Sequence, residues 1–133
     1  MYLVDTNVLS ELPRPRPAPA VLRWLQQQSA IVVSVVSVEE LAFGVARAPL
    51  GRRPKLARWL ESLLEAAETV DVSLTIAKAA GELRAARESA GRRVAQADML
   101  IAATAVVRGL TLATRNVRDF EACGVALINP FET

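Results

Sequence analysis

The sequence predicts a single α/β domain in which a parallel sheet of about five strands is sandwiched by helices. Three observations support this fold class. The apolar fraction is 52% and aromatic residues are few, which favours helices packed on a small aliphatic sheet. Ile31–Val36 is β-branched and almost continuously apolar, as is typical of a strand covered on both faces. Runs of this kind alternate with helical segments along all 133 residues, a length that suits one domain spanning 1–133.

The predicted elements alternate from the first residue onward. Met1–Val4 reads as a buried strand, and Val8–Leu12 as a short helix that Pro13 ends before an extended Pro-rich connector. Ser37 and Glu40 match a capping box that opens the helix after the second strand. The other elements are bounded by caps, prolines and glycines: helices near 19–28, 37–47, 53–67, 73–90, 95–107 and 117–123, and strands near 31–36, 69–72, 110–114 and 125–128.

Two features of the composition limit the chemistry that this chain can perform. It has no histidine, which excludes Ser-His-Asp and Cys-His sites, histidine-ligated zinc and histidine acid/base pairs. Its single cysteine, Cys123, excludes a disulfide framework and is expected to be a small buried hydrophobe in a reducing cytoplasm. No apolar run approaches the ~18 residues of a membrane helix, so a cytoplasmic protein without a membrane partner is expected.

Three acidic residues occupy positions that a parallel sheet would bring together. Asp5 ends the first strand, Glu40 falls in the first predicted turn after the second strand, and Asp98 begins a helix that is apolar on every side. The carboxyl edge of such a sheet is where open α/β folds bind ligands. Each acid also has a structural interpretation, with Asp5 or Thr6 as a helix cap, Glu40 in its box with Ser37, and Asp98 as a first-turn cap. A buried, unpaired carboxylate costs several kcal/mol, which favours function for Asp98.

Polar residues after the fourth predicted strand reach the same edge. They are Thr114, Arg115, Asn116 and, one turn further on, Asp119. Asn116 can also cap the short helix that follows, and Asp119 can complete that cap. Carboxylates that converge in this way repel one another by about 3 kcal/mol per pair at ~5 Å, so the cluster requires cations. All-oxygen ligands indicate Mg²⁺ or Mn²⁺, which hydrolyse phosphodiesters with a metal-activated water.

Four segments together resemble PIN-domain ribonuclease toxins of the VapC/FitB type, which belong to type II toxin–antitoxin systems. The segments occur in the family's order and spacing, and the resemblance extends from Met1 to Phe131. They are MYLVDTNVLSEL at 1–12, SVEEL at 37–41, DMLIAATA at 98–105 and TRNVRDF at 114–120. Any one segment would be weak evidence, whereas their combination is specific.

The resemblance implies a single PIN-like domain that is a Mg²⁺-dependent endoribonuclease, usually a homodimer, inhibited by a cognate antitoxin. The metal-binding acids of the family match Asp5, Glu40 and Asp98. Many relatives carry a fourth acid, and the matching place here is Asn116 with Asp119 nearby, so the resemblance leaves open whether one metal ion or two are bound. Thr6 and Thr114 match hydroxyls that commonly line the pocket.

Two sets of residues are candidates for contacts with macromolecules. Arg92 and Arg93, in the loop before Asp98, and Arg115 beside the site are expected to contact RNA phosphates rather than bases, the alternative being that loop arginines are simply solvated. The antitoxin groove is expected to include some of the few aromatic side chains and their neighbouring leucines: Trp24, Phe43, Trp59, Leu60 and Leu63. For Trp24, packing in the core is the stronger interpretation.

Two other functions fit parts of the sequence. A phosphotransfer domain could use Asp5 as its nucleophile, but it would want a second acid at Asn7 and a downstream lysine near the site, and neither is apparent. A catalytically weak protein-binding module could present Trp59 and Phe43 as its contact surface, but the intact set of acids argues against it. A calorimetric titration with Mn²⁺ separates the classes, because a binding module with residual acids takes up no metal.

Overall fold

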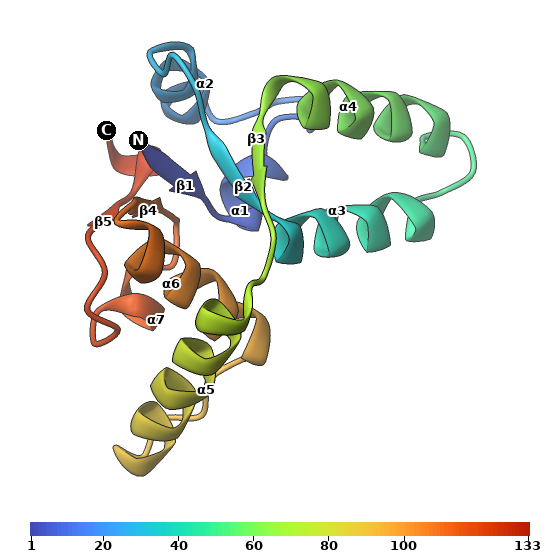
Figure 1. Ribbon diagram of the computed structural model, residues 1–133. Helices are drawn as coiled ribbons and strands as arrows, with labels where there is room; N and C mark the ends of the chain where they lie inside the picture. The colour runs from blue at the N-terminus through green and yellow to red at the C-terminus, as the bar shows by residue number, and fades with distance from the viewer.

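The computed structural model describes all 133 residues and contains one parallel sheet of five strands (Figure 1). The strands lie in the order β3-β2-β1-β4-β5, so the first strand is central. Leu3 of β1 pairs with Val32 on one side and with Leu112 on the other. The strands are β1 (Tyr2–Val4), β2 (Val32–Ser34), β3 (Glu68–Val70), β4 (Thr111–Ala113) and β5 (Leu127–Ile128). The predicted fold class is confirmed.

Helices cover both faces of this sheet. They are α1 (Thr6–Leu9), α2 (Pro19–Gln26), α3 (Val35–Arg47), α4 (Arg53–Ala66), α5 (Leu74–Ser89), α6 (Gln96–Arg108) and α7 (Val117–Phe120), followed by the 3₁₀ helix η1 (Pro130–Glu132). Because successive strand residues point to opposite faces, Leu3 and Leu112 join a core beneath α5 and α6, while Val4 and Ala113 join a second core beneath α1 to α4. The helices α3 and α4 form a hairpin that projects from the sheet (Figure 1).

The direction in which strands are added reverses between β1 and β4. The strands β2 and β3 extend the sheet on one side of β1, whereas β4 and β5 extend it on the other. Ligands of open α/β sheets bind at such a reversal point, outside the carboxyl ends of the strands. Asp5 directly follows β1 and Thr114 directly follows β4, and the Asp5 backbone N–H donates to the Ala113 carbonyl at 2.9 Å. The topology alone therefore brings Asp5 and Thr114 together.

The helix after β2 begins earlier than the sequence predicts. The hydroxyl of Ser34 caps it by accepting from the Val36 backbone N–H at 3.1 Å, and α3 starts at Val35. The predicted strand through Val36 and the predicted capping box of Ser37 with Glu40 are wrong, because the capping hydroxyl overrides the strand preference of the valines. Glu40 consequently lies in the second turn of α3, and Ser37 is fully buried.

The helix that the sequence describes as apolar all round is only partly central. Ile101–Ala105 of α6 are buried, but Val106 and Val107 near its C-terminus are 45% and 40% exposed. Asp98 is only half-buried, which is less than its apolar sequence neighbours predict. The helix ends at Gly109, whose φ of +64° lies in the left-handed region that favours glycine.

Cys123 is 4% exposed in the core, and burial raises the pKa of its thiol. Its predicted role as a small buried hydrophobe is confirmed. The short helix after β1 spans Thr6–Leu9 rather than Val8–Leu12, because Asp5 caps it directly at the strand end. None of the helices combines the length and the apolar character that crossing a membrane requires.

Candidate active site

Asp5 is the centre of the candidate site. It is 4% exposed, and its carboxylate accepts hydrogen bonds from the Thr6 backbone N–H (2.8 Å), the Thr114 hydroxyl (2.8 Å) and the Asn7 side-chain amide (3.0 Å). Burial raises the pKa of Asp5, the charge of Glu40 adds to the rise, and the hydrogen bonds oppose it. Asp5 does cap α1, through Thr6 and Asn7, yet the third contact comes from Thr114, which follows β4. The cap alone therefore does not account for its burial.

Glu40 reaches the site from α3 through a shared hydroxyl. The Thr6 hydroxyl donates to Glu40 Oε1 at 2.7 Å and lies 2.9 Å from the Ser37 hydroxyl oxygen. Because Thr6 follows Asp5 directly, one residue contacts both acids, and the two carboxylates lie near each other as the sheet topology predicts. Sequence reasoning assigned Ser37 only to a cap. Its position three residues before an acid on one helix face was the signal that could have placed it here.

Asp98 is a further acid of the site, although it comes from the opposite face of the sheet. Burial raises its pKa to about 6, and the negative charges of Asp5, Asp119 and Glu40 add to the rise. The helix α6 begins without a side-chain capping bond, although Asp98 stands in its first turn. Asp98 thus makes no capping hydrogen bond, although its first-turn position does favour the helix dipole. Three other carboxylates, those of Asp5, Asp119 and Glu40, repel it.

Asp119 is the fourth of these carboxylates. A small cleft of about 110 Å³ contains Asp98 and Asp119 together with Arg92 and Arg93, so the loop before α6 brings two cations next to two acids. Asn116 does not line this cleft, and its side chain makes no capping bond to α7. Of the two residues that the sequence offered for a fourth acidic position, Asp119 is the one that faces Asp98.

Asn7 and Thr114 hold the two sides of the reversal point together. Asn7 donates to Asp5 and also accepts from the Arg115 backbone N–H at 3.2 Å, so it ties the turn after β1 to the turn after β4. Thr114 is fully buried, and its hydroxyl accepts from the Asn116 backbone N–H at 3.1 Å while it donates to Asp5. Sequence reasoning missed Asn7 as a site residue. An amide two residues after a strand-ending acid was the available signal.

Arg115 presents its backbone, rather than its side chain, to this network. Its guanidinium lies over the Phe131 ring, 4.5 Å from the ring centroid. The side chain lines a surface hollow with Asn116 and Asp119, and it does not line the cleft that contains Asp98. A phosphate contact by Arg115 thus stays a prediction. Arg92 and Arg93, in contrast, do line the cleft that contains Asp98.

A groove of about 270 Å³ opens beside Glu40, between α1, α3 and α4. Thr6, Glu40 and Trp59 are among the residues that line it, and Phe43 is 48% exposed on α3 but outside the lining. Three residues that the sequence offered for an antitoxin groove are instead buried in the core, at 4%, 8% and 8% exposure: Trp24, Leu60 and Leu63. They form part of the core that supports α4, because helical spacing alone does not separate a core face from a groove.

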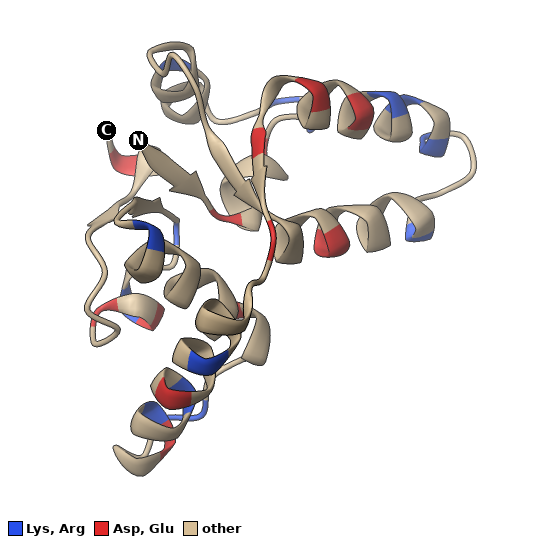
Figure 2. Ribbon diagram, in the orientation of Figure 1, with Lys and Arg blue, Asp and Glu red and all other residues tan.

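The donor chemistry of the site suits a hard divalent cation. Figure 2 shows acidic positions at the carboxyl end of β1, on α3 and on α7. All the donors are carboxylate or hydroxyl oxygens, which Mg²⁺ and Mn²⁺ prefer. No three acids stand close enough to hold one ion with their side chains as they are.

Known proteins are similar to this chain in both sequence and architecture. Residues 2–124 match the family model described as PIN domain. VapC ribonuclease Y4jK of Sinorhizobium fredii is 36% identical over 99% of each chain. Toxin FitB of Neisseria gonorrhoeae is 35% identical over 98% of this chain and 99% of its own length.

Solved structures agree with these relatives. FitAcB from Neisseria gonorrhoeae has a TM-score of 0.93 at 34% identity and is covered over 100% of each chain. VapBC-5 from Mycobacterium tuberculosis, a member of the VapBC family of toxin–antitoxin systems, has a TM-score of 0.73 at 29% identity over 96% of each chain. The similarity spans the whole fold and includes the strand ends that carry the acids. This chain therefore belongs to the PIN-domain family, in the group of the VapC and FitB toxins.

Proposed function

We propose that this protein is a Mg²⁺-dependent endoribonuclease and the toxin of a toxin–antitoxin pair. The observation that carries the proposal is the gathering of acids at the reversal point of the sheet. Asp5 and Glu40 both contact Thr6, and Asp98 and Asp119 line one cleft. Burial and the charges of the other three acids raise the pKa of Asp98 to about 6. Such coupling destabilises the folded protein unless a cation offsets it. A relative that is 36% identical is named a VapC ribonuclease, which supports RNA as the substrate.

The acids Asp5, Glu40 and Asp98 would hold Mg²⁺, or Mn²⁺ in its place, with Asp119 as the fourth acid. When bound, the cation would activate a water for attack on phosphorus and would stabilise the charge that develops on the phosphate. The chain's own residues prepare the ligands. Thr114 and Asn7 hold the Asp5 carboxylate in one orientation, and the Thr6 hydroxyl does the same for Glu40.

Arg92 and Arg93 are proposed to bind phosphates of the RNA strand. Both line the cleft that contains Asp98, and arginine presents a planar fork of donors that matches a phosphate. A cation at this position also offsets the repulsion between the acids and an incoming polyanion.

An antitoxin and a second copy of the chain are the proposed protein partners. The groove beside Glu40, with Trp59 in its lining, is a candidate for the antitoxin contact, and exposed Phe43 lies on the adjoining helix. Solved relatives that are toxin–antitoxin complexes support the antitoxin. Homodimerisation rests on the family resemblance and is tested by light scattering on the purified protein.

Cleavage of total bacterial RNA by the purified protein tests the enzymatic part. Cleavage with Mg²⁺ or Mn²⁺ is expected to leave 5′-phosphate and 3′-hydroxyl ends and to stop with EDTA. Asp98→Asn should abolish it, whereas Asp71→Asn, at an exposed acid after β3, should leave it intact. End groups that are 2′,3′-cyclic phosphates would contradict the mechanism.

A phosphotransfer function receives no support from the site. Asn7 is an amide that donates to Asp5, where such a site would want a second acid. The lysines of the chain are Lys55 and Lys78, and neither lines the groove beside Glu40 or the cleft of Asp98. Calorimetric uptake of Mn²⁺ would also separate the enzyme from a binding module with residual acids.

A further inference from the structure

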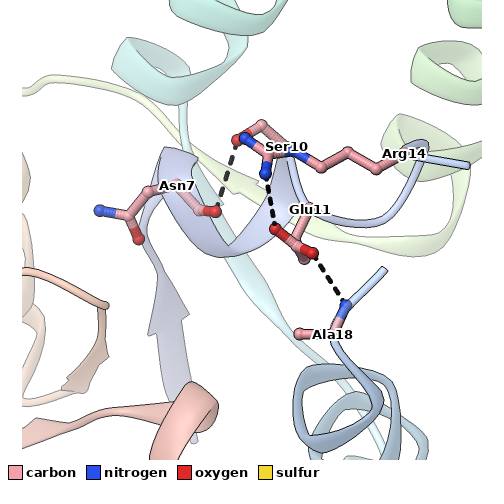
Figure 3. Close-up of polar contacts among 5 residues, drawn as sticks. All are labelled: Asn7, Ser10, Glu11, Arg14 and Ala18. Atoms are coloured by element: carbon pink, nitrogen blue, oxygen red, sulfur yellow. Dashed lines mark hydrogen bonds and ion pairs between the residues drawn. The ribbon is translucent and has the colours of Figure 1, made fainter. Parts of the chain in front are cut away.

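Glu11 is a buried carboxylate that the proposed chemistry does not use. It follows α1 and is 6% exposed, and Figure 3 shows it between two segments of the connector that leads to α2. One carboxylate oxygen accepts from the Ala18 backbone N–H at 2.8 Å, and the other lies 3.4 Å from Nη1 of Arg14. A buried carboxylate needs such partners, because its desolvation is costly.

Arg14 is the exposed partner of this pair. Its side chain is 61% exposed, against 8% for Glu11, and its backbone N–H donates to the Glu11 carbonyl at 3.3 Å. Pro13 and Pro15 flank it, and prolines restrict the backbone on both sides. The guanidinium therefore starts from a backbone with little freedom to lose, which lowers the entropic cost of binding a ligand.

Arg14 lines the groove that also contains Thr6 and Glu40. Glu40 is engaged by the Thr6 hydroxyl and forms no ion pair with Arg14, whose ion pair is with Glu11. A guanidinium has five N–H donors, and a single-atom contact with Glu11 leaves most of them available. Arg14 thus offers donors beside the acid cluster without neutralising its carboxylates.

The charge balance at the Arg14 end of the groove suits an RNA phosphate, in addition to the antitoxin contact proposed near Trp59. The acids at the sheet edge repel a polyanion, so a strand can approach them only where fixed cations offset the repulsion. Arg14 and Arg52 both line the groove beside Glu40 and supply that charge. Arg14 also partners the buried Glu11 carboxylate, but this single contact leaves most of its guanidinium donors free to face the groove.

We infer that Arg14 binds a phosphate of the RNA substrate next to the scissile bond, and that Glu11 is the residue that positions it. This inference rests on the proposed ribonuclease function. The phosphate contact of Arg14 would lie beside α1. The contacts proposed for Arg92 and Arg93 would come from the loop before α6.

The experiment compares Arg14→Gln with Arg16→Gln, an exposed arginine two residues further along the same connector that lines neither the groove nor the cleft. Binding of a labelled mixed-sequence single-stranded RNA is measured in EDTA at several salt concentrations, and cleavage of the same RNA is measured with Mg²⁺. Arg14→Gln should weaken RNA binding about three- to tenfold. It should also make the negative slope of log K against log salt about 0.7 shallower. It should lower kcat/KM to the same extent and leave kcat within about twofold.

Glu11→Gln tests the positioning role. Glutamine can still accept from the Ala18 N–H but no longer attracts Arg14, so binding should weaken while the salt slope stays near that of the wild type, since Arg14 remains charged. If Glu11→Gln fails to fold in a thermal melt, the Arg14 and Arg16 variants still decide the assignment of Arg14.

The outcomes separate this inference from the proposed function. If wild-type protein neither binds nor cleaves RNA, both are overturned. If wild-type protein does both and Arg14→Gln behaves like Arg16→Gln, only the inference is overturned. A loss of kcat with unchanged RNA affinity and salt slope would also overturn it, because a phosphate contact must change affinity.

Discussion

Asp98→Asn should stabilise the protein in the absence of metal while abolishing its response to metal. The reason is the raised pKa of Asp98, which burial and the charges of Asp5, Asp119 and Glu40 bring from 3.8 to about 6. At neutral pH, a carboxylate whose pKa is raised in the folded state carries its charge at the expense of the free energy of unfolding. Asparagine keeps the shape of the side chain and removes that cost.

The magnitude follows from the pKa and the exposure of Asp98. A rise from 3.8 to about 6 corresponds to at most about 3 kcal/mol. Because Asp98 is only half-buried, solvent screening reduces this to about 1–1.5 kcal/mol. For a domain of this size, such a gain raises Tm by about 3–6 °C.

The sign of the pH dependence provides a second check. The native state binds the extra proton between 3.8 and about 6, so this group stabilises the wild type as pH falls through that window. The advantage of Asp98→Asn is therefore full above about pH 7 and shrinks towards about pH 4. Asp71→Asn, at an exposed acid, is the matched control and should show neither effect.

Thermal melts with EDTA and with Mn²⁺, at both pH values, measure these effects. Wild-type protein should gain Tm with Mn²⁺ because the ion binds the native state, and Asp98→Asn should lose most of that gain. A variant that is less stable than wild type in EDTA, with an undiminished Mn²⁺ shift, would return Asp98 to a purely structural role and refute the reasoning.

Three further predictions concern the supporting residues. Thr114→Val leaves donors and acceptors of a fully buried network unpaired. It should lower the free energy of unfolding by about 1–3 kcal/mol in urea denaturation and impair RNA cleavage. Thr114→Ser should restore both. Trp59→Ala should weaken antitoxin binding, measured by calorimetry, by about 2 kcal/mol in a protein that still folds. Leu74→Ala, at an 86% exposed residue outside the groove, should leave the affinity unchanged. Equal affinities of the two variants would place the antitoxin elsewhere. Replacing Arg92 and Arg93 with Gln should lower the salt slope of RNA binding by about 1.4, and an unchanged slope would show that the two arginines are merely solvated.

Much of the fold could be predicted from local patterns. Ile31–Val36 indicated a strand buried on both faces, and its central part, β2, is buried at every position. The boundary after it could not be predicted, because Val35 and Val36 favour a strand by propensity and become helical through the Ser34 cap. Element existence depends on sums over many residues, whereas a boundary depends on one hydrogen bond.

The site shows the same division. That Asp5 ends a buried strand and that Glu40 and Asp98 belong to the same edge followed from their positions beside apolar runs. The contacts that orient them did not follow, because the Thr114 hydroxyl meets Asp5 across 109 residues of sequence and the Thr6 hydroxyl meets Glu40 across 34. Such pairs are defined by sheet order, which local patterns do not encode.

Burial and charge coupling were decided only by the tertiary structure. Trp59 and Leu60 are neighbours on one helix, yet one lines a groove and the other is buried in the core, since helical periodicity gives a face but not what covers it. Asp119, rather than Asn116, faces Asp98 because α7 turns it towards the cleft. The sequence by itself determined the elements, the parallel sheet and the strand-end acids, because these depend on periodicity and capping. Only the folded chain determined which side chains meet, because distance in space is set by packing.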